Sequence, residues 1–129
     1  MIYNMLQYLI TNRPLINFVA NGWNPDSNED TIMISETGGD PQHWYDRTDW
    51  AVQVLSRAKN VEIAKENIES VYALLKNKFG LVFPQVIIGG VTYPQVITYQ
   101  ITPMQTPGYL GATPEHLEMF SFNLTIVTT

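Results

Sequence analysis

The sequence predicts an α+β fold: a mainly antiparallel four-stranded sheet with helices packed on one face, plus a small hairpin. Between Thr48 and Phe79, an alternating strand pattern changes within a few residues into a long amphipathic helix. Helical spacing opens the chain and alternating segments close it, so helices and strands are largely segregated. A chain of 129 residues without cysteine is long enough to bury a core without disulfides. We therefore expect one domain, residues 1–129.

The segment from Thr48 to Phe79 has the clearest pattern. Trp50, Val52 and Val54 alternate with more polar residues, which predicts a strand with one buried face. The following helix should begin after Asn60 as N-cap and end near Gly80, which favours a left-handed stop. Its apolar stripe consists of Val61, Ala64, Ile68, Val71, Leu75 and Phe79.

The N-terminal segments predict two helical pieces and a strand. Residues 2–11 carry apolar residues at helical spacing, and Pro14 suits the first turn of a short second helix containing Leu15, Phe18 and Val19. Alternation from Thr31 to Ser35 predicts a short strand. We expect a long loop from residue 36 to residue 47, because two glycines and a proline interrupt the pattern.

The C-terminal third predicts a hairpin and two strands. Gly89-Gly90 favours a two-residue turn between residues 86–88 and 91–93. The next strand begins at Val96 and should turn Ile97, Tyr99 and Ile101 to one side. The prolines and glycines from Pro103 to Pro114 predict a loop without regular structure. In the last strand, residues 118–128, four apolar residues should point inward: Phe120, Phe122, Leu124 and Ile126.

Charge and polarity bound the function. A net charge of −5 and a pI near 4.8 argue against a protein that grips nucleic acid through its phosphates. Polar residues interrupt the apolar N-terminal stretch in every window long enough to cross a bilayer. We therefore expect a soluble protein without membrane contact.

The stretch from Glu36 to Asp49 holds most of the side chains able to support catalysis: Glu36, Asp40, His43, Asp46, Arg47 and Asp49. A small α+β hydrolase would need two of these groups at hydrogen-bond range, one with a pKa shifted by burial. The surrounding glycines and proline oppose such rigidity, so we favour a solvated or partner-contacting loop. His43 and His116 are far apart in sequence, and we expect no metal, no other cofactor and no enzymatic activity.

Aromatic residues in loops and at strand ends favour association. They can anchor an interface, or cap the core from its edges. The residues concerned are Trp23, Trp44, Tyr45, Tyr93, Tyr99 and Tyr109.

Several short motifs carry a family resemblance. They are Glu36-Thr37-Gly38-Gly39-Asp40-Pro41, the run Arg47 to Asp49, the strand Val52 to Lys59, Leu110-Gly111, and the closing Phe120-Ser121-Phe122-Asn123-Leu124. Over residues 31–128 the chain resembles the tail terminator and minor capsid proteins of long-tailed bacteriophages. It departs from them at Ala112-Thr113-Pro114, where that group often has an acidic residue and a glycine.

The resemblance implies a structural virion protein that forms a ring, six-fold in that family. Such a ring ends tail-tube growth and joins the tail to the head connector in the neck, with DNA passing through its lumen unbound. The implied partners are further copies of the chain, the tail tube protein and the head completion or connector protein, assembled in the host cytoplasm. Another phage neck or minor capsid component and a monomeric binding module remain alternatives. Expected interface residues are Asp40, His43, Trp44, Tyr45, Asp46, Arg47, Arg57 and Tyr109.

Overall fold

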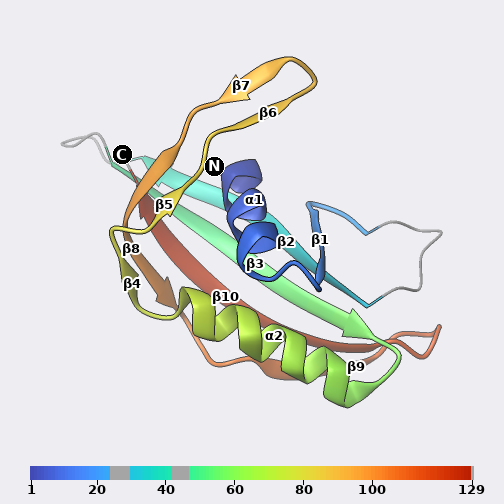
Figure 1. The fold of residues 1–129 in the computed structure, drawn as a ribbon. Coiled ribbons are helices and arrows are strands. Elements are labelled where there is room, and N and C mark those ends of the chain that lie inside the picture. Colours follow the sequence, from blue (N-terminus) through green and yellow to red (C-terminus); the bar gives the residue numbers. More distant parts are fainter. Residues whose placement is uncertain (24–29, 42–46, 129) are drawn as a thin grey trace.

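The computed structural model describes residues 1–23, 30–41 and 47–128 (Figure 1). The described residues form two helices, α1 (Ile2–Asn12) and α2 (Val61–Leu75), and ten strands. The strands are β1 (Asn17–Ala20), β2 (Thr31–Pro41), β3 (Thr48–Ala58), β4 (Lys78–Phe79), β5 (Val82–Phe83), β6 (Val86–Ile88), β7 (Val91–Tyr93), β8 (Val96–Pro103), β9 (Gly108–Ala112) and β10 (Glu118–Thr128).

The main sheet is larger than predicted and mixed. In the described residues it has eight strands in the order β1-β2-β3-β10-β8-β4, with β5 paired to β8 and β9 paired to β10. β1 runs parallel to β2, and β6 and β7 form a separate two-stranded sheet. The structure is α+β, but the prediction of a mainly antiparallel four-stranded sheet is wrong. Four short strands caused the error, because two to five residues do not show a clear alternation.

β1 is one of these strands. We expected Phe18 and Val19 to lie in a helical turn after Pro14, but they pair with Ile32 and Met33 of β2. The three residues from Phe18 to Ala20 are all half-buried, so no single face of β1 is distinctly apolar. The helical expectation rested on Pro14, whose fixed φ also suits a turn before a strand.

β2 continues through the first half of the expected loop. It pairs with β3 as far as Pro41, and a bulge between Glu36 and Gly38 adds one residue, Thr37. Gly38 adopts a φ of 127°, which side chains rarely allow, and the Thr37 hydroxyl donates to the carbonyl oxygen of Ala51 at 3.1 Å. The glycines that suggested a loop therefore fit a bulged strand.

The core lies between the main sheet and both helices, which pack on the same face of the sheet (Figure 1). The predicted inward residues of β10 and the apolar stripe of α2 from Ala64 to Leu75 are buried, as predicted. Asn60 caps α2 by accepting hydrogen bonds from the backbone N–H groups of Glu62 and Ile63. Among the described residues, no helix is long and apolar enough to span a membrane.

The C-terminal end of α2 differs from the prediction. The helix ends at Leu75, Asn77 takes a left-handed φ of 49°, and Phe79 lies in β4 with 73% of its surface exposed. Gly80 also has a positive φ, but it lies between β4 and β5 rather than at the helix end. Phe79 has the sequence spacing of the helical stripe, but it is not part of the helix because the chain has already entered strand β4.

β8 contains an irregularity that reverses its alternation. Its pairing with β10 shifts so that Gln100 lies opposite Val127 while Thr98 lies opposite Thr128. Thr98 and Ile101 are therefore buried, whereas Ile97 and Tyr99 are exposed. We predicted that Ile97 and Tyr99 would share a face with Ile101, and this prediction is wrong. The expected loop from Pro103 to Pro114 is also wrong in part, because it contains β9.

Candidate assembly surface

The expected interface residues around Arg47 are described only in part. His43, Trp44, Tyr45 and Asp46 lie outside the described residues. Asp40 lies in β2, with its backbone opposite Asp49 of β3. Within this group, Arg47 is therefore the residue whose side chain the structure describes.

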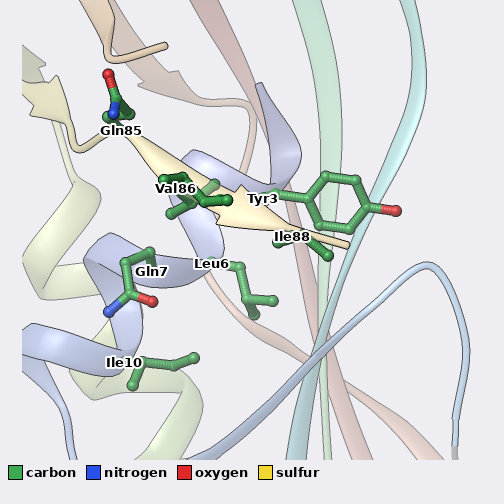
Figure 2. Close-up of a pocket in the computed structure, with 8 residues that line it drawn as sticks. Tyr3, Leu6, Gln7, Ile10, Gln85, Val86 and Ile88 are labelled. Carbon is green, nitrogen blue, oxygen red and sulfur yellow. The ribbon is translucent and has the colours of Figure 1, made fainter. Parts of the chain in front are cut away.

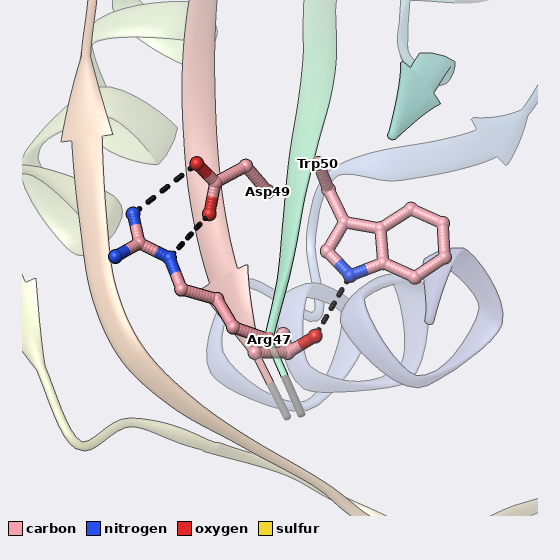
Figure 3. A network of polar contacts seen from close by, with 4 residues as sticks. Arg47, Asp49 and Trp50 are labelled. Atoms are coloured by element: carbon pink, nitrogen blue, oxygen red, sulfur yellow. Dashed lines mark hydrogen bonds and ion pairs between the residues drawn. The ribbon is translucent and has the colours of Figure 1, made fainter. Parts of the chain in front are cut away.

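Arg47 forms an ion pair within its own chain. Its Nε and Nη2 groups donate to the two carboxylate oxygens of Asp49 at 2.8 and 3.2 Å (Figure 3). The same figure shows Trp50, whose indole N–H donates to the hydroxyl of Thr128 at 2.8 Å. An exposed pair of this kind contributes about 0–1 kcal/mol. We expected Arg47 to bind an acid of a neighbouring copy, and in this chain its own Asp49 takes that place.

Arg57 lies on the face of the sheet opposite the helices. The neighbouring Ser56 is buried and donates to the carbonyl oxygen of Ala64 in α2, so Arg57 must point the other way. Its guanidinium lies 4.2 Å from the centre of the Trp23 ring. This cation–π contact attaches the segment after β1 to the open face of the sheet.

Tyr109 lies in β9, which pairs with β10 on the side away from β3. Its hydroxyl donates a hydrogen bond to a carboxylate oxygen of Glu118, and its ring packs 5.3 Å from that of Phe120. The hydrogen bond to Glu118 raises the pKa of the Tyr109 phenol above its ordinary value, and desolvation and the carboxylate charge act in the same direction. Tyr109 is 55% exposed, so a partner can reach it.

The strongest surface feature lies elsewhere, in a run without charge. The thirty-six residues from Phe79 to Pro114 contain no Asp, Glu, Lys, Arg or His. We call them the charge-free segment; they include all of β5 to β9. Of the fourteen large apolar side chains exposed in the described chain, ten belong to this segment. They are Phe79, Val82, Ile87, Ile88, Val91, Ile97, Tyr99, Met104, Tyr109 and Leu110.

Sequence reasoning missed this segment, although its signal is visible in the sequence. The absence of charge can be read directly, but the same letters also fit a buried core. Only the pairing of the strands shows that the apolar groups point outward. Where exposed apolar groups lie side by side, they are typical of interaction surfaces.

Part of the charge-free segment forms an apolar strip along one edge of the sheet. Val82 pairs with Ile97, and both neighbour fully buried residues in sequence, so their own side chains point away from the core. Phe79 pairs with Gln100 on the same outer face. Together with Tyr99 these residues form what we call the edge strip: Phe79, Val82, Ile97 and Tyr99.

The hairpin β6–β7 projects from the body of the molecule (Figure 1). Gly89 and Gly90 have φ values of 58° and 77°, as a type I′ turn requires, and this confirms the predicted hairpin. Buried Asn4 of α1 fixes its base, since its side-chain amide donates to three carbonyl oxygens, those of Pro84, Tyr93 and Pro94, at 2.9–3.2 Å. The hairpin is therefore a positioned arm.

Two hollows flank α1. The first, of about 350 Å³, lies between α1 and β6, with Tyr3, Leu6 and Ile10 on one side and Val86 and Ile88 on the other (Figure 2). The second, of about 470 Å³, lies where the α1–β1 connection meets the start of α2. Its apolar lining is Leu15, Ile16 and Ile63, and its polar lining is Asn17, Asp30, Lys59 and Asn67.

No protein-family model matches the chain, and no curated protein is significantly similar to it. Among the described residues, no group of three or more His, Cys, Asp or Glu side chains could hold a metal ion. The exposed apolar surface is thus the feature on which a functional proposal can rest.

Proposed function

We propose that the protein is a structural subunit whose copies assemble into a closed ring, and that the ring ends the tail tube of a phage and joins it to the head connector. The observation that carries the proposal is the charge-free segment, with its ten exposed large apolar side chains. Burying such groups is the main favourable contribution to association.

Net charge explains why association should use this segment. A chain with a net charge of −5 repels its own copies over most of its surface. A surface without ionisable groups avoids this repulsion and has no charge to desolvate when it is covered. The segment therefore suits contact between like-charged copies of one acidic protein.

The two ends of the molecule differ, which favours a head-to-tail arrangement. The hairpin lies at one end, beyond the start of α1, and the hollow at Leu15 lies at the other end of that helix (Figure 1). Unlike surfaces on one chain give heterologous contacts, and these close into a ring when the rotation between copies permits.

The tail-terminating role comes from the resemblance of residues 31–128 to tail terminator proteins. It supplies the proposed partners: the tail tube protein on one side of the ring and the head completion protein on the other. An acidic ring also suits DNA that passes through without binding, because phosphates are repelled. In this proposal the protein is assembled in the host cytoplasm and remains in the neck of the virion.

Growing tail tubes test the proposal. Tube protein is polymerised with and without the purified chain, and the tubes are examined by electron microscopy. We expect a six-fold ring at one tube end and an end to growth there. Uniform binding along the tube, or tubes that lengthen unchanged at every concentration of the chain, would contradict it.

A further inference from the structure

We infer that the hairpin of one copy docks into the hollow at Leu15 of the next copy. The inference rests on the proposed ring and names one contact that holds its subunits together. The donor is the hairpin tip, defined as Ile87, Ile88 and Val91. The acceptor is the receptor hollow, defined by its apolar lining of Leu15, Ile16 and Ile63.

The hairpin tip is only partly covered by its own chain, because Ile88 faces α1 across the first hollow. Ile87 is 66% exposed and Val91 is 53% exposed, although both are apolar. A two-stranded hairpin is at best marginally stable by itself in water. Covering the tip with a second surface would bury these side chains and stabilise the arm.

The arm is already in position before it docks. Asn4 binds three carbonyl groups at its base, and the ring of Tyr3 packs 5.2 Å from that of Tyr93. An arm ordered in advance loses less conformational entropy on association than a flexible loop would. Such an arm is suited to enter a preformed hollow.

The receptor hollow is equally well fixed. Leu15 is 99% exposed, yet it lies in a tight turn in which the backbone N–H of Ile16 donates to the carbonyl oxygen of Arg13 at 3.2 Å. The Arg13 side chain attaches this turn to α2 by donating to the Ser70 hydroxyl at 2.6 Å. The turn therefore holds the whole Leu15 side chain where it can provide an apolar contact for a partner.

Charge and position favour the hairpin tip of a second copy as the occupant. The charged residues that line the hollow, Asp30 and Lys59, have opposite signs, so an occupant need bring no charge, and the whole hairpin has none. The tip cannot serve the hollow of its own chain. The hairpin base is bound at Asn4, and the eight helical residues from there to Asn12 alone span about 12 Å before the chain reaches the turn that carries Leu15.

The chain contains no cysteine, so a disulfide between two engineered cysteines would test this contact without competing thiols. Ile88→Cys and Asn67→Cys are made in separate full-length chains, mixed under the conditions in which rings form, and oxidised. We expect a disulfide between the two variants, since it requires Cα atoms within roughly 7 Å. Ile88→Cys mixed with Tyr99→Cys is the matched control, and it tests docking on the edge strip instead.

Electron microscopy of the same samples separates the two proposals. Rings with the 88–67 disulfide support both. Rings without it, or with the 88–99 disulfide in its place, overturn the docking inference and leave the ring standing. The 88–67 disulfide in dimers or open chains supports the docking and overturns the ring. Neither rings nor the disulfide would overturn both.

A second variant pair keeps the inference testable without cross-linking. Leu15→Asp should abolish ring formation, whereas Leu15→Met should preserve it, because only the first places a charge against the tip. The Leu15 side chain is 99% exposed, so neither change touches the core, and circular dichroism should be unchanged. Rings formed equally well by Leu15→Asp would overturn the inference.

Discussion

Two neighbouring regions of this chain use apolar residues in opposite ways. The stretch from Thr48 to Leu75, which includes β3 and α2, carries seven charged residues, and its only exposed large apolar side chains are Val61 and Ile63 at the start of the helix. In the charge-free segment, ten large apolar side chains are exposed. In our proposal the first region stabilises the fold and the second serves association.

The sharpest comparison uses one phenylalanine from each kind of environment. Phe122→Ala in β10 removes a fully buried ring that packs edge-on against Tyr72, and should lower the free energy of unfolding by about 3–5 kcal/mol. Phe79→Ala should change it by no more than about 0.5 kcal/mol. Urea unfolding measures both.

For association, Phe79→Ala should have the larger effect and Phe122→Ala the smaller one. Phe79→Ala should weaken the assembly by roughly tenfold, because it removes an exposed apolar group of the edge strip. Sedimentation of the two proteins checks this. A large loss of stability from Phe79→Ala, with unchanged assembly, would remove the distinction between the two regions.

The attachment of the hairpin gives the next effect in size. Asn4→Ala leaves three carbonyl groups without their donor and should cost about 1–3 kcal/mol. Hydrogen exchange in residues 85–93 should rise more than in β10, because the arm loses its base contact. Thr11→Ala, on an exposed position of α1 outside the hollow at the hairpin, is the control and should leave exchange unchanged. Equal exchange in both variants would show that Asn4 does not position the hairpin.

A substitution at the N-cap of α2 tests the stretch from Thr48 to Leu75 separately from the charge-free segment. Asn60→Ala removes the acceptor of two backbone N–H groups and should cost about 1 kcal/mol. Asn60→Asp should restore most of this stability, since aspartate is an equally good cap. Thermal unfolding measures the change, and assembly per folded chain should be unaffected. A selective loss of assembly would mean that α2 also takes part in association.

The smallest expected effect is a loss of stability at alkaline pH, when the Tyr109 phenol ionises. The pKa of Tyr109 is raised in the folded chain, so its contribution to stability is present below the ordinary tyrosine pKa near 10 and is lost as pH rises through the raised value. Ultraviolet titration of the phenolate should detect this shift, and Glu118→Gln should reduce it. An unchanged titration in that variant would exclude Glu118 as the main cause.

The parts of the fold that the sequence predicts are the long regular ones. β3, α2 and β10 each repeat their pattern over eleven or more residues, and their buried faces were predicted correctly except at the two ends of the α2 stripe, Val61 and Phe79. β1 and β9 escaped prediction because four or five residues, several of them glycine or small, carry little periodicity. The irregularity at Tyr99 and the bulge at Thr37 depend on pairing partners far away in the chain, which no local pattern shows.

The expected interface residues stay predictions, because the structure contains a single chain. Arg47 and Arg57 were expected to meet a partner, but the structure gives each a contact within the chain, with Asp49 and Trp23. The pattern of the charge-free segment predicts strands and loops but does not show which of its side chains are exposed. Their exposure follows from strand register and from the projection of the hairpin, which exist only in the folded chain.

Hydrogen exchange on assembly tests the central claim most directly. Exchange is compared between dilute chains and chains assembled at tube ends. We predict that protection on assembly is concentrated in residues 79–114 and around Leu15, while the exposed face of α2 at Glu62, Glu66 and Glu69 is unchanged. Protection of that charged face, with residues 79–114 still exchanging as in the dilute chain, would contradict the account.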